Sequence, residues 1–254
     1  MSAEITQLAF TPIKGTRLLT MDEIELSREG ARGDRRFFVI DGRDRMVNGK
    51  TVGELSEVVA SCRDDVLRLE FPDGHVVEDE VHPGEIVTAR FYSRQRDGRV
   101  VDGPFACALS EHVGRPLRLL EALCGVDRGR AGGVSLISEA SLARLAEVGG
   151  LETIDSRRFR MLVEVRGPGA HEEDQWLGRK VRIGAATIRV NGHVGRCLIT
   201  SRHPDTGKID VPTLDILGEY RRELDSTEPL PFGIYGEVRE PATIRVGDPV
   251  APID

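Results

Sequence analysis

The order of apolar and polar residues along the chain predicts mostly β-strands. In "RRFFVIDGRDRMV" two apolar runs flank an Asp-Gly turn, and in "VLRLEFPDGHVVEDEV" the residues Leu67, Leu69 and Phe71 alternate with polar residues before a Pro-Asp-Gly turn. Turns of this composition between apolar runs are typical of β-hairpins. We therefore expect two hairpins here, and further short strands in "RPLRLLEA", "RFRMLVEVRG", "KVRIGAATIRV" and "ATIRVGDPV".

A few stretches have the spacing of helices instead. "SEASLARLAEVGG" carries Leu142, Leu145 and Val148 on one face, begins with Ser138 as a predicted N-cap and ends in Gly-Gly. "TLDILGEYRREL" and the shorter "FACALSEHVG" have a similar spacing. Because few helices separate many short strands, the pattern favours a barrel or sandwich over alternating βαβ units. The predicted fold class is mainly β with some α (α+β).

The composition narrows the function classes. The chain of 254 residues has 35 basic and 42 acidic residues spread throughout and a formal net charge of −7, so no broad basic surface for duplex nucleic acid is expected. The start "MSAEITQLAF" lacks the charged and apolar regions of a signal peptide, and no window approaches the roughly eighteen apolar residues of a membrane span. We expect a cytoplasmic protein with no nucleic-acid partner and no membrane contact.

The cysteines are the first candidates for chemistry. They are far apart and form no CxxC motif, which argues against a disulfide framework and against a structural zinc site. Cys197 differs from the others because it lies in "NGHVGRCLITSRHPDTG", a segment that resembles a β-hairpin, after an arginine and before a Pro-Asp-Thr-Gly turn. The residues alone leave three interpretations of Cys197: an inert buried thiol, a nucleophile or sulfur carrier, or a ligand of a soft metal. We interpret Cys62, Cys107 and Cys124 as thiols without a special role.

Several motifs, in order along the chain, resemble those of one family. The stretch "TPIKGTRLLTMDEIELSREGARGDRRFFVIDGRDRMV" is similar to the N-terminal β-barrel domain of MOSC proteins, a family named after the molybdenum cofactor sulfurase C-terminal domain. The motifs "SEASL", "RRFR", "DQWLGRKVRIG", "GRCLITSRHPDTG" and "PATIRVGDPV" resemble the MOSC domain itself. The resemblance covers nearly the whole chain. It implies two β-barrel-like lobes, a MOSC N-terminal β-barrel domain over residues 1–115 and a MOSC domain over residues 116–254.

The resemblance also implies an activity. In MOSC enzymes such as the mitochondrial amidoxime-reducing component, a molybdenum pyranopterin (Mo-molybdopterin) reduces N-hydroxylated small molecules with electrons from a separate protein. Cys197 lies where these enzymes place the cysteine that ligates molybdenum, so Cys197 is implied as both the catalytic residue and the metal ligand. A polarisable thiolate suits a metal that already has sulfur ligands. We therefore expect a molybdenum-dependent oxidoreductase that uses a small-molecule substrate and a separate electron-donor protein.

The resemblance places polar side chains around this cofactor, which carries a phosphate. Arginine suits phosphate because it donates two parallel hydrogen bonds, and a helix N-terminus such as that at Ser138 also attracts anions. Arg196, beside Cys197, would help to keep the thiol ionised. Because adjacent strand residues face opposite sides, we expect one of Arg35 and Arg36 to face the cofactor. The implied cofactor-binding residues are Lys14, Arg35, Arg36, Ser138, Arg160 and Arg196.

The chain departs from the family pattern at three places near the expected site. Met161 and Leu162 stand where the family's reductases typically have Pro-Asn, Val194 stands where a second cysteine often occurs, and Gly49-Lys50 stand in place of Arg-Gln. A leucine side chain makes no hydrogen bond. If Leu162 replaces an asparagine that contacts the cofactor, we expect the pocket to lack one polar anchor.

Two other functions are compatible with the same residues. Cys197 would carry a persulfide in a sulfur carrier, which would need a partner desulfurase, or the chain would be a non-catalytic MOSC binding module. His193 and His203 flank Cys197, but their spacing fits no zinc pattern and a fourth ligand is missing. The sequence has no four-cysteine ferredoxin pattern and no glycine-rich dinucleotide fingerprint. Under the oxidoreductase interpretation, the electrons must therefore come from another protein.

Overall fold

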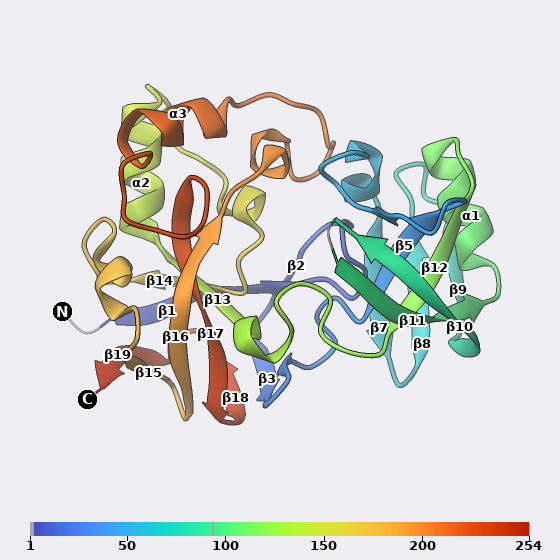
Figure 1. The fold of residues 1–254 in the computed structure, drawn as a ribbon, viewed down its shortest axis with the longest axis horizontal. Coiled ribbons are helices and arrows are strands. Elements are labelled where there is room, and N and C mark those ends of the chain that lie inside the picture. The colour runs from blue at the N-terminus through green and yellow to red at the C-terminus, as the bar shows by residue number, and fades with distance from the viewer. Residues whose placement is uncertain (1–2, 93, 254) are drawn as a thin grey trace.

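The protein, described by a computed structural model over residues 3–92 and 94–253, forms two β-rich lobes that lie side by side (Figure 1). The lobe that contains the first and the last described residues holds a β-barrel with two α-helices beside it. The other lobe holds two smaller sheets and one α-helix. This mainly β architecture with a few α-helices confirms the predicted fold class.

The first lobe is built around a closed barrel. In the described part of the chain seven strands follow one another around the barrel. The pairing of β1 (Ala3–Phe10) with β14 (Val163–Arg166) closes the ring. Neighbouring strands are antiparallel except β13 (Val134–Ser138) and β14 (Val163–Arg166), which are parallel. Around the ring the strands are β1 (Ala3–Phe10), β14 (Val163–Arg166), β13 (Val134–Ser138), β17 (Pro231–Glu240), β16 (Ala186–Gly195), β15 (Lys180–Ile183) and β19 (Pro249–Ile253).

Alternating apolar residues fill this barrel. On β14 the side chains of Val163 and Val165 are buried, and on β16 those of Ile188 and Val190 are buried, two residues apart in each strand. This spacing puts them on one face of the strand, as expected for a barrel interior. Short strands extend the barrel at one side: β2 (Leu19–Met21) pairs with β1, and β3 (Glu23–Ser27), β4 (Gly30–Ala31) and β18 (Ala242–Arg245) form a small sheet.

Two α-helices cover one side of the barrel lobe. They are α2 (Glu139–Val148) and α3 (Thr213–Tyr220), and their apolar residues pack together with Phe232 at the start of β17. The Ser138 side chain accepts a hydrogen bond from the backbone N–H of Ser141 at 3.1 Å, which confirms the predicted N-cap. Among the described residues, no helix is both long enough and apolar enough to cross a bilayer.

The second lobe packs a five-stranded sheet against a three-stranded sheet. Both predicted hairpins lie here, one between β5 (Phe37–Asp41) and β6 (Met46–Val47) and one between β8 (Val66–Glu70) and β9 (Val76–Glu80). In spatial order the larger sheet contains β10 (His82–Phe91), β11 (Arg94–Asp102), β12 (Leu117–Ala122), β5 (Phe37–Asp41) and β6 (Met46–Val47). The smaller sheet contains β7 (Val59–Arg63), β8 (Val66–Glu70) and β9 (Val76–Glu80), and α1 (Phe105–Val113) packs beside them.

The run "FFVI" in β5 is apolar at every position because both faces of this strand are buried. Phe37 and Val39 face the core shared with the smaller sheet, whereas Phe38 and Ile40 face a separate cluster on the other side. Short 3-10 helices connect the strands of both lobes: η1 (Gly53–Glu57), η2 (Gly129–Gly132), η3 (Ser156–Phe159), η4 (Glu172–Trp176) and η5 (Leu198–Ser201).

The chain passes between the lobes twice. β1 to β4 belong to the barrel lobe, β5 to β12 form the second lobe, and β13 to β19 return to the barrel. The lobes are therefore not two consecutive parts of the sequence. The boundary predicted near residue 115 lies close to the second passage, whereas the first passage lies between β4 and β5.

Two glycines bring the lobes into close contact. Gly207, in the loop that follows η5, lies against Gly53 at the start of η1, and a Cβ at Gly207 would stand 2.0 Å from the Gly53 carbonyl oxygen. Gly207 also has a φ of +65°, a backbone conformation that residues with a Cβ adopt at a cost. The loop around Gly207 is thus held against the second lobe by backbone contact.

We expect Gly207→Ala to destabilise the protein more than a matched glycine substitution. Gly74 has a φ of +84° and open space where a Cβ would go, so Gly74→Ala measures the backbone cost alone, about 1–2 kcal/mol. Gly207→Ala adds a steric clash, typically worth about 1–3 kcal/mol. Urea unfolding of both variants measures the difference, and equal losses would show that the lobes do not depend on this contact.

Candidate functional site

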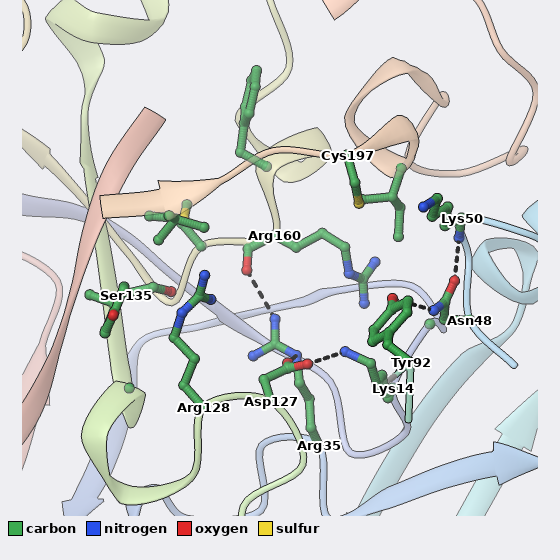
Figure 2. Close-up of a pocket in the computed structure, with 17 residues that line it drawn as sticks. Lys14, Arg35, Asn48, Lys50, Tyr92, Asp127, Arg128, Ser135, Arg160 and Cys197 are labelled. Carbon is green, nitrogen blue, oxygen red and sulfur yellow. Dashed lines mark hydrogen bonds and ion pairs between the residues drawn. The ribbon is translucent and has the colours of Figure 1, made fainter. Parts of the chain in front are cut away.

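A pocket lies at the junction of the two lobes, and it gathers side chains that are far apart in the sequence (Figure 2). Its walls come from the loops after β1 and before β5, from the loop after β6, from the tip of the β10–β11 hairpin, and from the barrel. The residues that line it are Lys14, Gly15, Arg35, Asn48, Lys50, Tyr92, Asp127, Arg128, Gly132, Ser135, Phe159, Arg160, Met161, Val194, Cys197, Ile199 and Tyr235.

Lys14 and Arg35 meet because two chain segments run beside each other. Ile13 forms a parallel bridge with Phe37, and the backbone N–H of Arg35 donates to the Thr11 carbonyl oxygen at 2.7 Å. Both cations contact Asp127: the Lys14 Nζ forms an ion pair with it, and the Arg35 Nε lies 3.3 Å from its carboxylate.

The charge of Asp127 is set by these two cations. Burial disfavours the charged carboxylate, but Lys14 and Arg35 outweigh burial and hold the pKa of Asp127 well below its usual value. Asp127 is therefore ionised at neutral pH, and it neutralises part of the positive charge on this wall.

The positive charge of Arg160 is only weakly balanced by nearby negative charge. Its guanidinium donates to the Thr16 carbonyl oxygen at 2.8 Å, and within the described residues it forms no ion pair with a carboxylate. Its own carbonyl oxygen accepts a hydrogen bond from Arg35 at 3.0 Å. Burial, together with the neighbouring Arg35, lowers the pKa of Arg160 to about 10. The remaining N–H groups of Arg160 are thus available to an anion in the pocket.

Arg35 and Arg160 also share an uncommon backbone conformation. Their φ angles are +49° and +54°, in the left-handed region that residues with a Cβ rarely adopt. Such strain is maintained where the surrounding structure requires it, and it is concentrated at functional sites.

A third wall comes from the second lobe. Asn48 donates to the Tyr92 hydroxyl at 2.9 Å and accepts from the backbone N–H of Lys50 at 2.9 Å, so Asn48 connects both neighbours. On the barrel side, the Arg128 guanidinium lies 4.4 Å from the ring centroid of Tyr235 and 3.2 Å from the Glu228 carboxylate. Sequence reasoning noted Gly49-Lys50 only as a departure from the family pattern and missed the other residues of this group, although "MVNGK" and "GVDRG" bring polar residues directly before or after glycines.

Cys197 lies on the opposite wall, where Figure 2 shows its sulfur directed into the pocket. It is half-buried and has an extended backbone just before η5, and its carbonyl oxygen accepts from the Thr200 N–H at 3.0 Å. In place of a hairpin of two strands, η5 follows soon after β16, and an isolated antiparallel bridge between Arg202 and Ile209 closes the Pro-Asp-Thr-Gly turn. Val194 and Ile199 make the surroundings of Cys197 on this wall partly apolar.

Arg196 does not line the pocket, because its side chain is buried in the barrel lobe. It donates to the carbonyl oxygens of Phe232 and Phe159, each at 2.8 Å, and its guanidinium lies over both rings. Burial, and then repulsion from Arg128, lower the pKa of Arg196 to about 9. Successive side chains of an extended chain point to opposite sides, so Cys197 faces the pocket while Arg196 holds β17 and η3 together.

Arg36 and Ser138 also lie away from the pocket. Arg36, directly before β5, points away from the pocket and forms ion pairs with Asp65 at 2.6 Å and with Glu121 at 2.7 Å. Ser138 is fully buried and donates to the Glu173 carboxylate at 2.9 Å. The Glu173 carboxyl therefore accepts hydrogen bonds at the start of α2 from within the protein, and burial raises its pKa.

The side chain of Leu162 lies in the barrel core, 3% exposed, and does not line the pocket. The neighbouring Met161 lines it instead. The expectation that Leu162 removes a polar anchor from the pocket is therefore wrong for this chain, since position 162 faces the barrel interior.

His193 is buried beside Ser226, at 3.2 Å, and His203 accepts from the Asp205 N–H at 3.2 Å, so both belong to local networks.

Comparison with known families accounts for both parts of the chain. The model of the MOSC N-terminal beta barrel domain matches residues 2–110, and that of the MOSC domain matches residues 126–251. The chain belongs to the MOSC family. This membership confirms the resemblance found in the sequence.

Named relatives of this MOSC protein are similar over nearly its whole length. Mitochondrial amidoxime-reducing component 1 from Xenopus laevis is 26% identical, and that from Mus musculus is 28% identical; each match covers 97% of this chain and 81% of the relative. Mitochondrial amidoxime reducing component 2 from Homo sapiens is 41% identical over 99 residues, which cover 36% of this chain and 29% of the relative.

The donor set of the pocket fits an anionic ligand that also carries a soft metal. Arg160 and Lys50 face the pocket without an ion pair to a described carboxylate, and cations of this kind bind phosphate. Cys197 offers a soft sulfur donor in the same pocket. Within the described residues, no group of three or more His, Cys, Asp or Glu side chains gathers to hold a metal unaided. A metal at Cys197 would therefore need further ligands from a cofactor.

We expect Arg160→Gln to weaken the binding of inorganic pyrophosphate by about tenfold or more, because a hydrogen bond to a charged group is worth about 1.5–3 kcal/mol. Arg36→Gln provides the matched control, since Arg36 lies outside the pocket and should leave the affinity within about twofold. Titration calorimetry at neutral pH measures both. Equal affinity in the two variants would show that Arg160 does not bind anions.

Proposed function

We propose that this protein is a molybdenum-cofactor-dependent oxidoreductase that reduces N-hydroxylated small molecules, with Cys197 as the protein ligand of the metal. The observation that carries the proposal is the arrangement of one half-buried thiol across a pocket from cations that lack full compensation. The relatives named amidoxime-reducing component support the same class of substrate.

Each wall of the pocket would hold a different part of the cofactor. Arg160 and Lys14, with Arg35 behind them, would hold the phosphate of a pyranopterin, and Arg128 with Tyr235 would border the ring system. Cys197 would complete the sulfur ligands of the metal from the opposite side. The bound cofactor supplies a metal that accepts and donates electron pairs, and the chain supplies the binding, the orientation and the surrounding charge.

The overall reaction is balanced by electrons from outside the chain. An N-hydroxylated substrate takes up two electrons and two protons, its N–O bond breaks, and the products are the reduced nitrogen compound and water. Because the pocket is lined by cations and tyrosines, it favours a polar substrate that is neutral or negative at its entrance. The electrons would come from a separate redox protein.

We expect Cys197→Ser to lower N-hydroxy-substrate turnover by at least about a hundredfold while the fold remains intact, because even residues that only support a metal ligand often cost 10–100-fold. Cys62→Ser is the matched control: Cys62 is also half-buried, but it lies beside Arg36, outside the pocket. This variant should retain nearly full turnover. Circular dichroism checks the fold, and both enzymes must come from a host that makes molybdopterin.

Metal analysis of the same preparations separates this function from the alternatives. Molybdenum near one per chain in the wild type supports the oxidoreductase. Labile sulfur on Cys197 without molybdenum would instead identify a sulfur carrier, and the absence of both would leave a non-catalytic binding module. Full turnover by the Cys197→Ser variant would remove Cys197 from the mechanism.

A further inference from the structure

The pocket that contains Cys197 borders two shallower hollows, and Tyr92 lines all three. Tyr92 directly follows β10, at the tip of the β10–β11 hairpin, and 64% of its surface is exposed. The hydrogen bond from Asn48 holds its hydroxyl at the pocket entrance. Any protein that covers the entrance must therefore contact this hairpin tip.

Basic side chains surround Tyr92 on both sides. One hollow is lined by Arg45, Lys50 and Arg90, and the other by Arg94, Arg96 and Arg128. We call these six residues the basic rim. The carboxylates of Asp127 and Glu228 line the second hollow, but Asp127 is already bound by Lys14 and Arg35, and Glu228 by Arg128.

Most side chains of the basic rim form no ion pair or hydrogen bond with the described residues. Within residues 3–92 and 94–253, the side chains of Arg45, Lys50, Arg94 and Arg96 make no ion pair or hydrogen bond, and Arg90 donates to the carbonyl oxygen of Tyr92 at 3.3 Å. The chain as a whole carries a net charge of −7, so this concentration of uncompensated positive charge is local. Such a patch attracts negatively charged partners and speeds their association.

We propose that the basic rim is the docking surface for an acidic redox protein, which delivers electrons to the pocket. This inference rests on the proposed reductase function, which requires a separate electron donor. A donor that docks on the rim lies directly over the entrance, and electron transfer becomes much faster as the distance between redox centres shortens. The rim is small, which suits the transient contacts typical of redox partners.

Charge complementarity favours a protein over a nucleic acid as the occupant. The rim cations surround a pocket entrance, whereas proteins that bind nucleic acid present basic residues along an extended groove or stripe. Outside the rim, acidic residues outnumber basic ones, and they would repel a longer polyanion. A compact protein with an acidic face avoids this repulsion.

The test measures binding, so that it does not depend on turnover. The probe is an oxidised plant-type [2Fe–2S] ferredoxin, which is strongly acidic, and calorimetry gives its Kd at low salt and at about 200 mM salt. The double variant Arg94→Glu/Arg96→Glu reverses two rim charges that take no part in the pocket. Its matched control is Lys180→Glu/Arg182→Glu, two exposed cations with the same spacing on the barrel strand β15.

We expect the rim variant to bind the ferredoxin at least about tenfold more weakly than the wild type and to lose most of the salt dependence. The control variant should bind within about twofold of the wild type. Turnover driven by dithionite-reduced methyl viologen should be unchanged in the rim variant, whereas turnover driven by reduced ferredoxin should fall in proportion to the lost affinity.

Three results would contradict the proposal that the basic rim is a docking surface. They are the absence of ferredoxin binding by the wild type at low salt, equal affinity in the rim and control variants, and tighter rim-dependent binding of a 20-nucleotide single-stranded RNA than of ferredoxin. If ferredoxin binding depends on the rim but no electron donor supports N-hydroxy reduction, the docking surface is supported and the proposed reaction is the part that fails.

Discussion

The pairing of β1 with β14 is the constraint on which the site depends. This pairing closes the barrel, and it forces the first strand of the chain to lie between strands that come more than 150 residues later. The segment that leaves β1 must then cross from the barrel to the second lobe, and it carries Lys14 along the junction. The segment that enters β5 runs beside it and adds Arg35. The pocket is thus a consequence of how the barrel closes, since its walls are the connections that closure brings together.

The charges of the pocket are arranged in layers. Asp127 is ionised between Lys14 and Arg35, and it balances one of their two positive charges. Arg160 stands in front of it with a lowered pKa and with N–H groups that the protein does not satisfy. A low dielectric environment makes each uncompensated charge more effective than it would be in water. Asp127 therefore fixes the positions of Lys14 and Arg35, and Arg160 provides the attraction for an anion.

The sequence predicted the elements better than it predicted the directions of side chains. Hairpins at Asp-Gly turns and the Ser138 cap follow from local chemistry, so they were found from the sequence. The placement of Arg36, Arg196 and Leu162 depends on which face of a strand or loop is turned inward, and that is decided by the distant strands that pack on it. Tyr92 and Lys50 reach the pocket through the packing of the second lobe on the barrel, which no local pattern contains. Whether the residues that do meet in the pocket bind the cofactor stays a prediction.

The double passage of the chain between the lobes affects the order in which the protein is able to fold during synthesis. The second lobe is complete once β12 has been made, and its strands pair with one another. β1 leaves the ribosome before the other barrel strands, and its short partner β2 soon follows, but its partners β14 and β19 come only near residues 163 and 249. Contacts between such distant segments form slowly. The first half of β1 therefore has no neighbouring strand until late in synthesis, and the pocket forms last, after the barrel has closed beside a lobe that is already folded.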